Sequence, residues 1–154
     1  MSGEANNETI FYTSVYRHGV DEKRRVQVPS KWRPENADWE YMLILWPNGG
    51  KADENILVLP PKRMLALTAK LSEMSSSDPE AQSLRRLVGS KSASTRMDKA
   101  GRFMMNEEMA KKAGIDKEAV LVGLVDRFEI WAPDRYDKIS VTDEVLLPEA
   151  FKLI

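Results

Sequence analysis

The sequence contains no cysteine and only one histidine, His18. The absence of cysteine excludes disulfides, thiolate metal sites and cysteine nucleophiles, and it fits a reducing compartment such as the cytosol. A lone histidine excludes a catalytic triad and a histidine zinc cluster, so we expect His18 to be a polar turn residue. We therefore expect a protein that is not an enzyme and that holds neither a metal nor a cofactor.

Long apolar runs are also missing. No stretch approaches the roughly 18 apolar residues of a membrane helix, and the longest apolar segments have the length of strands. The first residues, Met1–Thr9, are polar and acidic and lack the features of a secretory signal. We expect a soluble cytoplasmic protein with no membrane partner, in which residues 1–10 form a flexible arm.

The net charge is small, −1 over 154 residues, but it is unevenly distributed. Between residues 17 and 33, six cations accompany two carboxylates, a local balance of +4 that leaves −5 for the rest of the chain. The cations are Arg17, Lys23, Arg24, Arg25, Lys31 and Arg33. A basic segment on an otherwise acidic protein is typical of one local contact with a polyanion rather than of a general nucleic-acid coat.

One short pattern occurs twice. An aspartate is followed four residues later by an arginine, and then by an alternating apolar run, at Asp21–Arg25 and again at Asp98–Arg102. The alternation predicts a strand with one buried face after each turn. Each motif is followed by a hairpin pattern and a helix start, so the chain consists of two weakly similar halves. We expect the two halves to pack into one core, because neither buries its apolar face alone.

Helices are predicted between and around these halves. An apolar face of period 3.6 begins at Pro60–Pro61, Asp78 and Pro79 begin a second helix that ends at Gly89, and Asn106 begins a third. The polar segment from Pro47 to Asn55 is predicted to be a hairpin loop. The predicted units are a first repeat at 11–76, a linking helix within 77–95, a second repeat at 96–139 and an apolar tail at 140–154 that docks on a neighbouring surface.

Two interpretations of the motif arginines are possible. An arginine presents a planar fork of donors that pairs with a guanine edge or a phosphate, so Arg25 and Arg102 are candidate DNA contacts. Alternatively, each arginine only pins its turn by a salt bridge to Asp21 or Asp98. Both aspartates are predicted to orient their turns, since a carboxylate facing a phosphate would be repelled. The further DNA-binding candidates are Lys23, Arg24, Arg17, Arg33 and Lys99.

Together these residues resemble a known family. The paired motifs, the run from Asp98 to Arg102, the stretch from Ala113 to Gly123 and the stretch from Asp126 to Trp131 are similar to the MraZ family, which is built from two AbrB-like repeats. The resemblance spans about Phe11 to Lys138. It implies an α+β fold, mainly a swapped-hairpin β-barrel formed by two pseudo-symmetric AbrB-like (SpoVT-AbrB) repeats with connecting and peripheral helices. One departure is Arg24, where the family commonly has glycine.

The same resemblance implies a function. Members of the family are sequence-specific DNA-binding transcriptional regulators of division and cell-wall genes, and their chains assemble into rings that present motif arginines to repeated DNA boxes. We therefore expect a nucleoid-associated homo-oligomer, a repressor of its own gene cluster, whose partner is double-stranded promoter DNA. The alternative is an antitoxin-like module of the same fold that binds a second protein and has no DNA specificity of its own.

Overall fold

The computed structural model describes residues 8–36, 38–47 and 54–154. Most of the predicted N-terminal arm and most of the predicted hairpin loop, residues 1–7 and 48–53, lie outside the described residues. The described chain is a mixed α+β protein in which every named strand pairing is antiparallel, as predicted. None of its helices is long and apolar enough to cross a membrane, as judged over the described residues.

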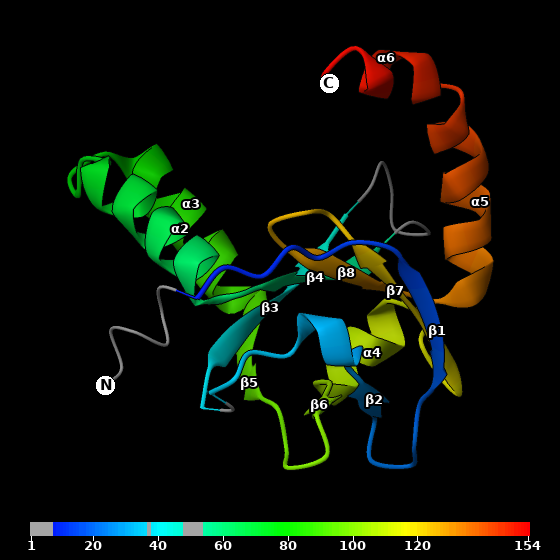
Figure 1. Cartoon of the computed structure of the whole chain (residues 1–154). Coiled ribbons are helices and arrows are strands. Elements are labelled where there is room, and N and C mark those ends of the chain that lie inside the picture. The colour runs from blue at the N-terminus through cyan, green and yellow to red at the C-terminus, as the bar shows by residue number, and fades with distance from the viewer. Residues whose placement is uncertain (1–7, 37, 48–53) are drawn as a thin grey trace.

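The strands form two sheets (Figure 1). A six-stranded sheet has the order β1-β7-β8-β4-β3-β5, and a two-stranded sheet joins β2 to β6. Their bounds are β1 Val15–Gly19, β2 Arg25–Gln27, β3 Glu40–Trp46, β4 Asn55–Leu59, β5 Ser92–Arg96, β6 Arg102–Met104, β7 Glu118–Gly123 and β8 Phe128–Trp131.

The two halves of the chain exchange strands. β1 of the first half pairs with β7 of the second, and β5 of the second half pairs with β3 of the first. β2 pairs with β6, with Val26 opposite Phe103, and β4 pairs with β8. Exchanging each first-half strand for its second-half counterpart gives the same strand order read from the opposite edge of the sheet. Within the described residues both sheets contain strands of both halves, and the main core cluster draws on both halves, which confirms the prediction of one shared core.

The core is an aromatic cluster drawn from both halves. Trp32 is 1% exposed, and its ring centroid lies 5.7 Å from that of Tyr12, 5.3 Å from that of Tyr16 and 4.9 Å from that of Phe128. Phe103 stacks at 6.1 Å on Phe128. Trp32 follows β2 in the short 3-10 helix η1, Ser30–Trp32. Burial of these rings stabilises the segment just behind the first motif, because large aromatic side chains dominate core energetics.

The helices are α2 (Pro61–Glu73), α3 (Pro79–Ser90), α4 (Glu107–Lys112), α5 (Pro133–Glu144) and α6 (Leu147–Phe151). The predicted caps of two of them are present: Asp78 accepts a hydrogen bond from the backbone of Glu80, and Asn106 accepts one from that of Met109. α4 has two glutamates in its first turn and two lysines in its last, as the helix dipole favours.

Two features differ from the sequence-based expectation: His18, predicted to be a turn residue, lies in β1 opposite Ala119, and the segment after α3 is a strand. The linking helix ends at Ser90, and residues 92–96 form β5, whose small polar residues show no apolar alternation and are held by pairing with β3. The tail is largely helical, in α5 and α6, and its apolar side chains are exposed in the single chain. These exposed residues are Val141, Val145, Leu146, Leu147, Phe151, Leu153 and Ile154.

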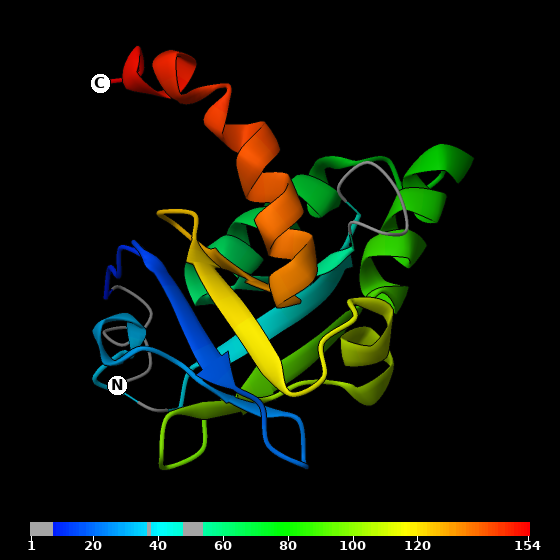
Figure 2. The ribbon, with the colours of Figure 1, turned by 90° about the vertical axis from the view of Figure 1, so that its right-hand side faces the viewer.

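Four of the helices, α2, α3, α5 and α6, lie away from the motif turns. The α2–α3 pair and the α5–α6 pair project from one end of the molecule, while the two motif turns, between β1 and β2 and between β5 and β6, project from the opposite end (Figure 1). A view turned by 90° shows the same separation (Figure 2). The end of the molecule with the two turns is therefore open to a partner of extended shape.

A close approach at Gly123 gives a first testable prediction. A Cβ on this residue would overlap the backbone carbonyl of Tyr12, which cannot move without breaking the Tyr12–Val125 bridge. We expect Gly123→Ala to lower the free energy of unfolding by about 3 kcal/mol, as overpacking does. Urea unfolding measures this. The control is Gly89→Ala in α3, where the Cβ meets open space and helix propensity favours alanine by up to about 1 kcal/mol.

Candidate nucleic-acid interface

The first motif turn is built around the carboxylate of Asp21. Its Oδ1 accepts hydrogen bonds from the backbone N–H of Lys23 at 3.0 Å and of Arg25 at 2.8 Å. Its Oδ2 accepts a hydrogen bond from Nε of the Arg25 side chain at 2.6 Å. One carboxylate thus closes the turn and fixes the direction of the arginine side chain. These contacts explain the four-residue spacing of the aspartate and the arginine.

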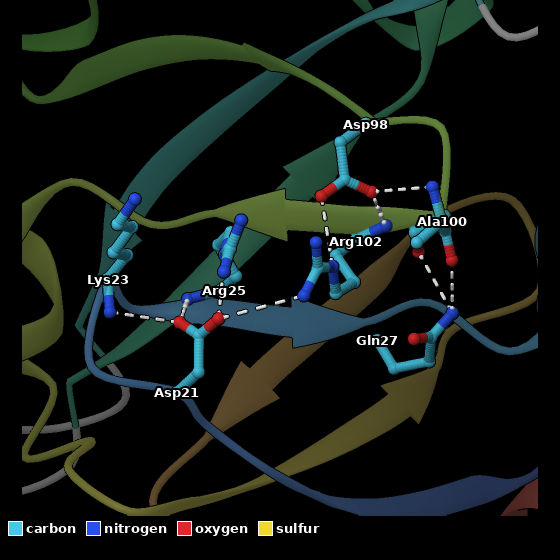
Figure 3. A network of polar contacts seen from close by, with 8 residues as sticks. Asp21, Lys23, Arg25, Gln27, Asp98, Ala100 and Arg102 are labelled. Carbon is cyan, nitrogen blue, oxygen red and sulfur yellow. Dashed lines mark hydrogen bonds and ion pairs between the residues drawn. The ribbon is translucent and has the colours of Figure 1, made fainter.

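The second motif turn repeats this geometry (Figure 3). Oδ1 of Asp98 accepts from the backbone N–H of Ala100 at 2.9 Å and of Arg102 at 3.0 Å, and Oδ2 accepts from Nε of Arg102 at 2.9 Å. The predicted turn-orienting role of the two aspartates therefore agrees with every one of these contacts.

The two turns also contact each other. β2 and β6 place them in register, with Gln27 opposite Arg102. The side-chain amide of Gln27 donates to the carbonyl oxygen of Ala100 at 2.8 Å, and Nη1 of Arg102 lies 3.8 Å from Oδ2 of Asp21. The two arginines consequently belong to one continuous surface (Figure 3).

The geometry leaves donors available for a partner. Nε of Arg25 is occupied by Asp21, but within the described residues its two Nη groups make no hydrogen bond, and its side chain is 31% exposed. Arg102 is similar, at 33% exposed, apart from the long contact to Asp21. A guanidinium held by Nε with free Nη groups can pair with two acceptors side by side, as on a guanine edge or a phosphate. For both arginines, a salt bridge to the aspartate is therefore compatible with a contact to DNA.

An open groove of about 620 Å³ runs beside the two arginines. Its lining includes four cations and two carboxylates: Lys23, Arg25, Arg96 and Arg102 with Glu40 and Asp98. Sequence reasoning missed Arg96, which lies at the end of β5, 3.5 Å from Glu40, with its side chain 59% exposed. The available signal was its position two residues before Asp98. The lining has an excess of positive charge, as a polyanion site requires.

The other predicted residues separate into groups. Lys23 and Lys99 are exposed on the two turns. Arg17 is not brought to the turns: it points from β1 to α5, where its Nη2 lies 2.7 Å from Asp137. Arg33 is half-buried behind the second turn, where its Nε donates to the carbonyl oxygen of Val28 at 2.9 Å.

Arg24 takes the backbone conformation that the glycine of the second turn takes. Its φ is +61°, and that of Gly101 is +78°. The departure from glycine therefore leaves the turn geometry intact, at a strain of about 1 to 2 kcal/mol for a residue with a Cβ. The Nε of Arg24 donates to the carbonyl oxygen of Met105 at 3.3 Å.

The pKa values of the two aspartates follow from these contacts. The backbone N–H of Arg25 holds the pKa of Asp21 below its ordinary value of 3.8, against a smaller opposing effect of burial, and the Arg25 guanidinium adds to the lowering. The backbone N–H of Arg102 does the same for the pKa of Asp98. Both carboxylates are charged at neutral pH.

A pH dependence is predicted from these directions. A carboxylate whose pKa is lower in the folded protein stabilises the fold above the unfolded-state pKa, and this contribution is lost as the pH falls through the folded pKa. We expect the double variant Asp21→Asn/Asp98→Asn to lose less stability than the wild type between pH 5 and pH 2, as measured by urea unfolding. Parallel pH profiles for the two proteins would contradict this account.

Comparisons with known proteins identify relatives of this chain. The family model described as "MraZ protein", antitoxin-like, matches residues 90–148. A protein of Herpetosiphon aurantiacus named "Transcriptional regulator MraZ" is 31% identical over 136 residues, which are 87% of this chain and 91% of that protein. A protein of the same name from Finegoldia magna is 30% identical over 130 residues, which are 84% of this chain and 87% of that protein. One from Acidithiobacillus ferrooxidans is 28% identical over 135 residues, which are 86% of this chain and 89% of that protein.

Proposed function

This chain belongs to the MraZ family, a family of regulators rather than enzymes, and from that premise we propose that it regulates transcription by binding double-stranded DNA through its two motif turns. The observation that supports this best is the pair of equivalent turns on one end of the molecule. Each holds an arginine by its Nε and leaves the Nη groups available.

In the proposed complex each residue type has its own task. Arg25 and Arg102 pair with guanine edges in the major groove, where two side-by-side acceptors match the guanidinium fork. Asp21 and Asp98 keep the forks in place and do not contact DNA. Lys23, Lys99 and Arg96 contact phosphates, which increases affinity without adding sequence information. The side chains of Arg24 and Arg33 are bound to backbone carbonyls, and Arg17 lies apart from the turns, so their contribution to DNA contact is smaller.

A single pair of turns presents too few contacts for tight binding, so the proposal includes a homo-oligomer, a ring whose turns engage repeated DNA boxes. Linked weak contacts multiply through effective concentration. The exposed apolar side chains of α5 and α6 support it, because apolar surface of this extent is typical of protein interfaces. In this proposal the tail at 140–154 docks on a neighbouring subunit.

The finer description of the fold and of the regulation belongs to the same proposal. The strand exchange supports a swapped-hairpin barrel made of two AbrB-like repeats, at 11–76 and 96–139. The segment 77–95 joins them, and its last residues add β5 to the second repeat. The protein acts in the cytoplasm at the nucleoid, as a repressor of its own division and cell-wall gene cluster.

DNase I footprinting on the region upstream of its own gene tests this function. We expect several short protected segments of similar sequence at regular spacing, and loss of all protection when one box is scrambled in a two-box fragment. A uniform, sequence-independent protection would contradict specific recognition. An absence of protection, together with capture of a second protein in a stable complex, would favour the antitoxin-like alternative.

A further inference from the structure

The two motif turns are alike in geometry, but three of their five residues differ, and one of these differences is Arg24 against Gly101. The residue at this position takes a positive φ in both turns. Its carbonyl oxygen accepts the same backbone hydrogen bond in each, from Met105 to Arg24 and from Val28 to Gly101, both at 2.9 Å. Val28 and Met105 occupy equivalent positions in the two halves. Val28 lies two residues after Val26, and Met105 lies two residues after Phe103.

A guanidinium stands at the same place in both turns. In the first turn Nε of Arg24 donates to the carbonyl oxygen of Met105. In the second turn Nε of Arg33 donates to the carbonyl oxygen of Val28. A Cβ on Gly101 would lie 2.5 Å from Nε and 2.6 Å from Cζ of Arg33, so Arg33 occupies the space that a side chain at position 101 would need.

The residue equivalent to Arg33 completes the comparison. Arg33 lies 12 residues after Asp21. The residue 12 positions after Asp98 is Ala110, in α4. Ala110 is 3% exposed and lines a groove of about 550 Å³ that Arg24 also lines. The first turn thus combines arginine at position 24 with alanine at 110, and the second combines glycine at 101 with arginine at 33.

We propose that Arg24 and Arg33 are equivalent positioning residues, one guanidinium for each turn. The first turn supplies its own, and the residue that follows η1 supplies the one for the second turn. Each guanidinium anchors the carbonyl of the residue whose N–H binds its turn, Met105 for the first turn and Val28 for the second. It thereby holds the neighbouring Arg25 or Arg102 in the direction set by its aspartate. The first turn tolerates an arginine at position 24 because the short side chain of Ala110 leaves room for the Arg24 guanidinium. The second turn needs glycine at position 101 because the Arg33 side chain fills the equivalent space.

Moving the arginine tests the proposal. Arg33→Ala removes the guanidinium of the second turn, and we expect hydrogen–deuterium exchange of the amides from Met97 to Met104 to become about tenfold faster, the effect of losing one charge-assisted hydrogen bond. The double variant Arg33→Ala/Gly101→Arg restores the guanidinium from within the turn, and its exchange should return to within about threefold of the wild type. Gly101→Arg alone should be the least protected, because two side chains compete for one place.

The reverse exchange is made in the first turn and keeps the proposal testable if one variant fails to fold. Arg24→Gly should speed exchange of the amides from Val20 to Gln27, and adding Ala110→Arg should slow it again. The proposal would be overturned if the amides of each double variant exchanged as fast as those of its single variant, Arg33→Ala for the second turn and Arg24→Gly for the first.

The effect on DNA rests on the proposed function and is measured separately. The affinity for the upstream DNA should fall about tenfold in Arg33→Ala and recover in the double variant, since a turn that is not held loses its orientation. Protection that is lost and restored while DNA affinity stays constant would support the positioning pair and count against the DNA-binding role of the second turn.

Discussion

Replacing Arg25 with alanine is expected to weaken binding to the specific DNA by about 100-fold while the oligomer remains intact. A good bidentate contact to a base contributes about 1 to 3 kcal/mol of discrimination, and the loss recurs in every subunit that engages a box. The fold should not suffer, because the side chain is 31% exposed and its salt bridge to Asp21 lies at the surface. Fluorescence anisotropy gives the affinity, and sedimentation velocity gives the assembly.

A matched control exists within the chain. Arg127 also donates its Nε to a neighbouring aspartate, Asp126, at 3.0 Å, and its side chain is 28% exposed. It lies between β7 and β8 rather than on a motif turn, so Arg127→Ala should change DNA affinity by less than about twofold. Arg25→Lys should behave like Arg25→Ala, because a lysine lacks the planar fork. Equal losses in the Arg25 and Arg127 variants would refute a role specific to the turn.

Replacing Trp32 with alanine is expected to lower the free energy of unfolding by about 3 to 5 kcal/mol, as the loss of a buried aromatic residue does. Trp32 is 1% exposed, contacts three aromatic rings and donates Nε1–H to the carbonyl oxygen of Thr13 at 3.1 Å. A domain of this size has a total stability of about 5 to 15 kcal/mol, so the variant should be largely unfolded on mild heating. Thermal unfolding followed by circular dichroism measures the change.

Trp46 is the control for this prediction. It is the same residue type at the end of β3 but is 45% exposed. Trp46→Ala should therefore cost less than about 1 kcal/mol. If both tryptophan variants lost stability equally, the aromatic cluster behind the first turn would not be the main source of stability in this half of the fold.

The local features of the turns were predictable from the sequence. The four-residue spacing of Asp21 and Arg25 corresponds to a carboxylate that accepts from both the backbone and the side chain of the arginine. The two halves were recognisable as repeats, and the caps at Asp78 and Asn106 followed from residue type. These features depend on neighbouring residues, so the sequence contains the information directly.

The pairing between the halves was not predictable in the same way. β5 consists of serine, alanine, threonine and arginine, and it is a strand because β3 lies beside it, not because of its own pattern. Arg17 belongs to the basic segment of the sequence, yet alternation along β1 turns it toward Asp137. The contact of Arg33 with Gly101 joins residues far apart in the chain. Long-range contacts of this kind are fixed by the tertiary fold rather than by local residue preference.

The central claim is that the arginine turns read a DNA sequence. The most direct measurement is an anisotropy titration of the wild-type protein against DNA from upstream of its own gene and against a scrambled duplex of equal length, at two salt concentrations. The account predicts at least about 1,000-fold tighter binding to the native duplex, with both affinities falling as salt rises. Equal affinity for the two duplexes at both salt concentrations would contradict it, because the turns would then contact only phosphates.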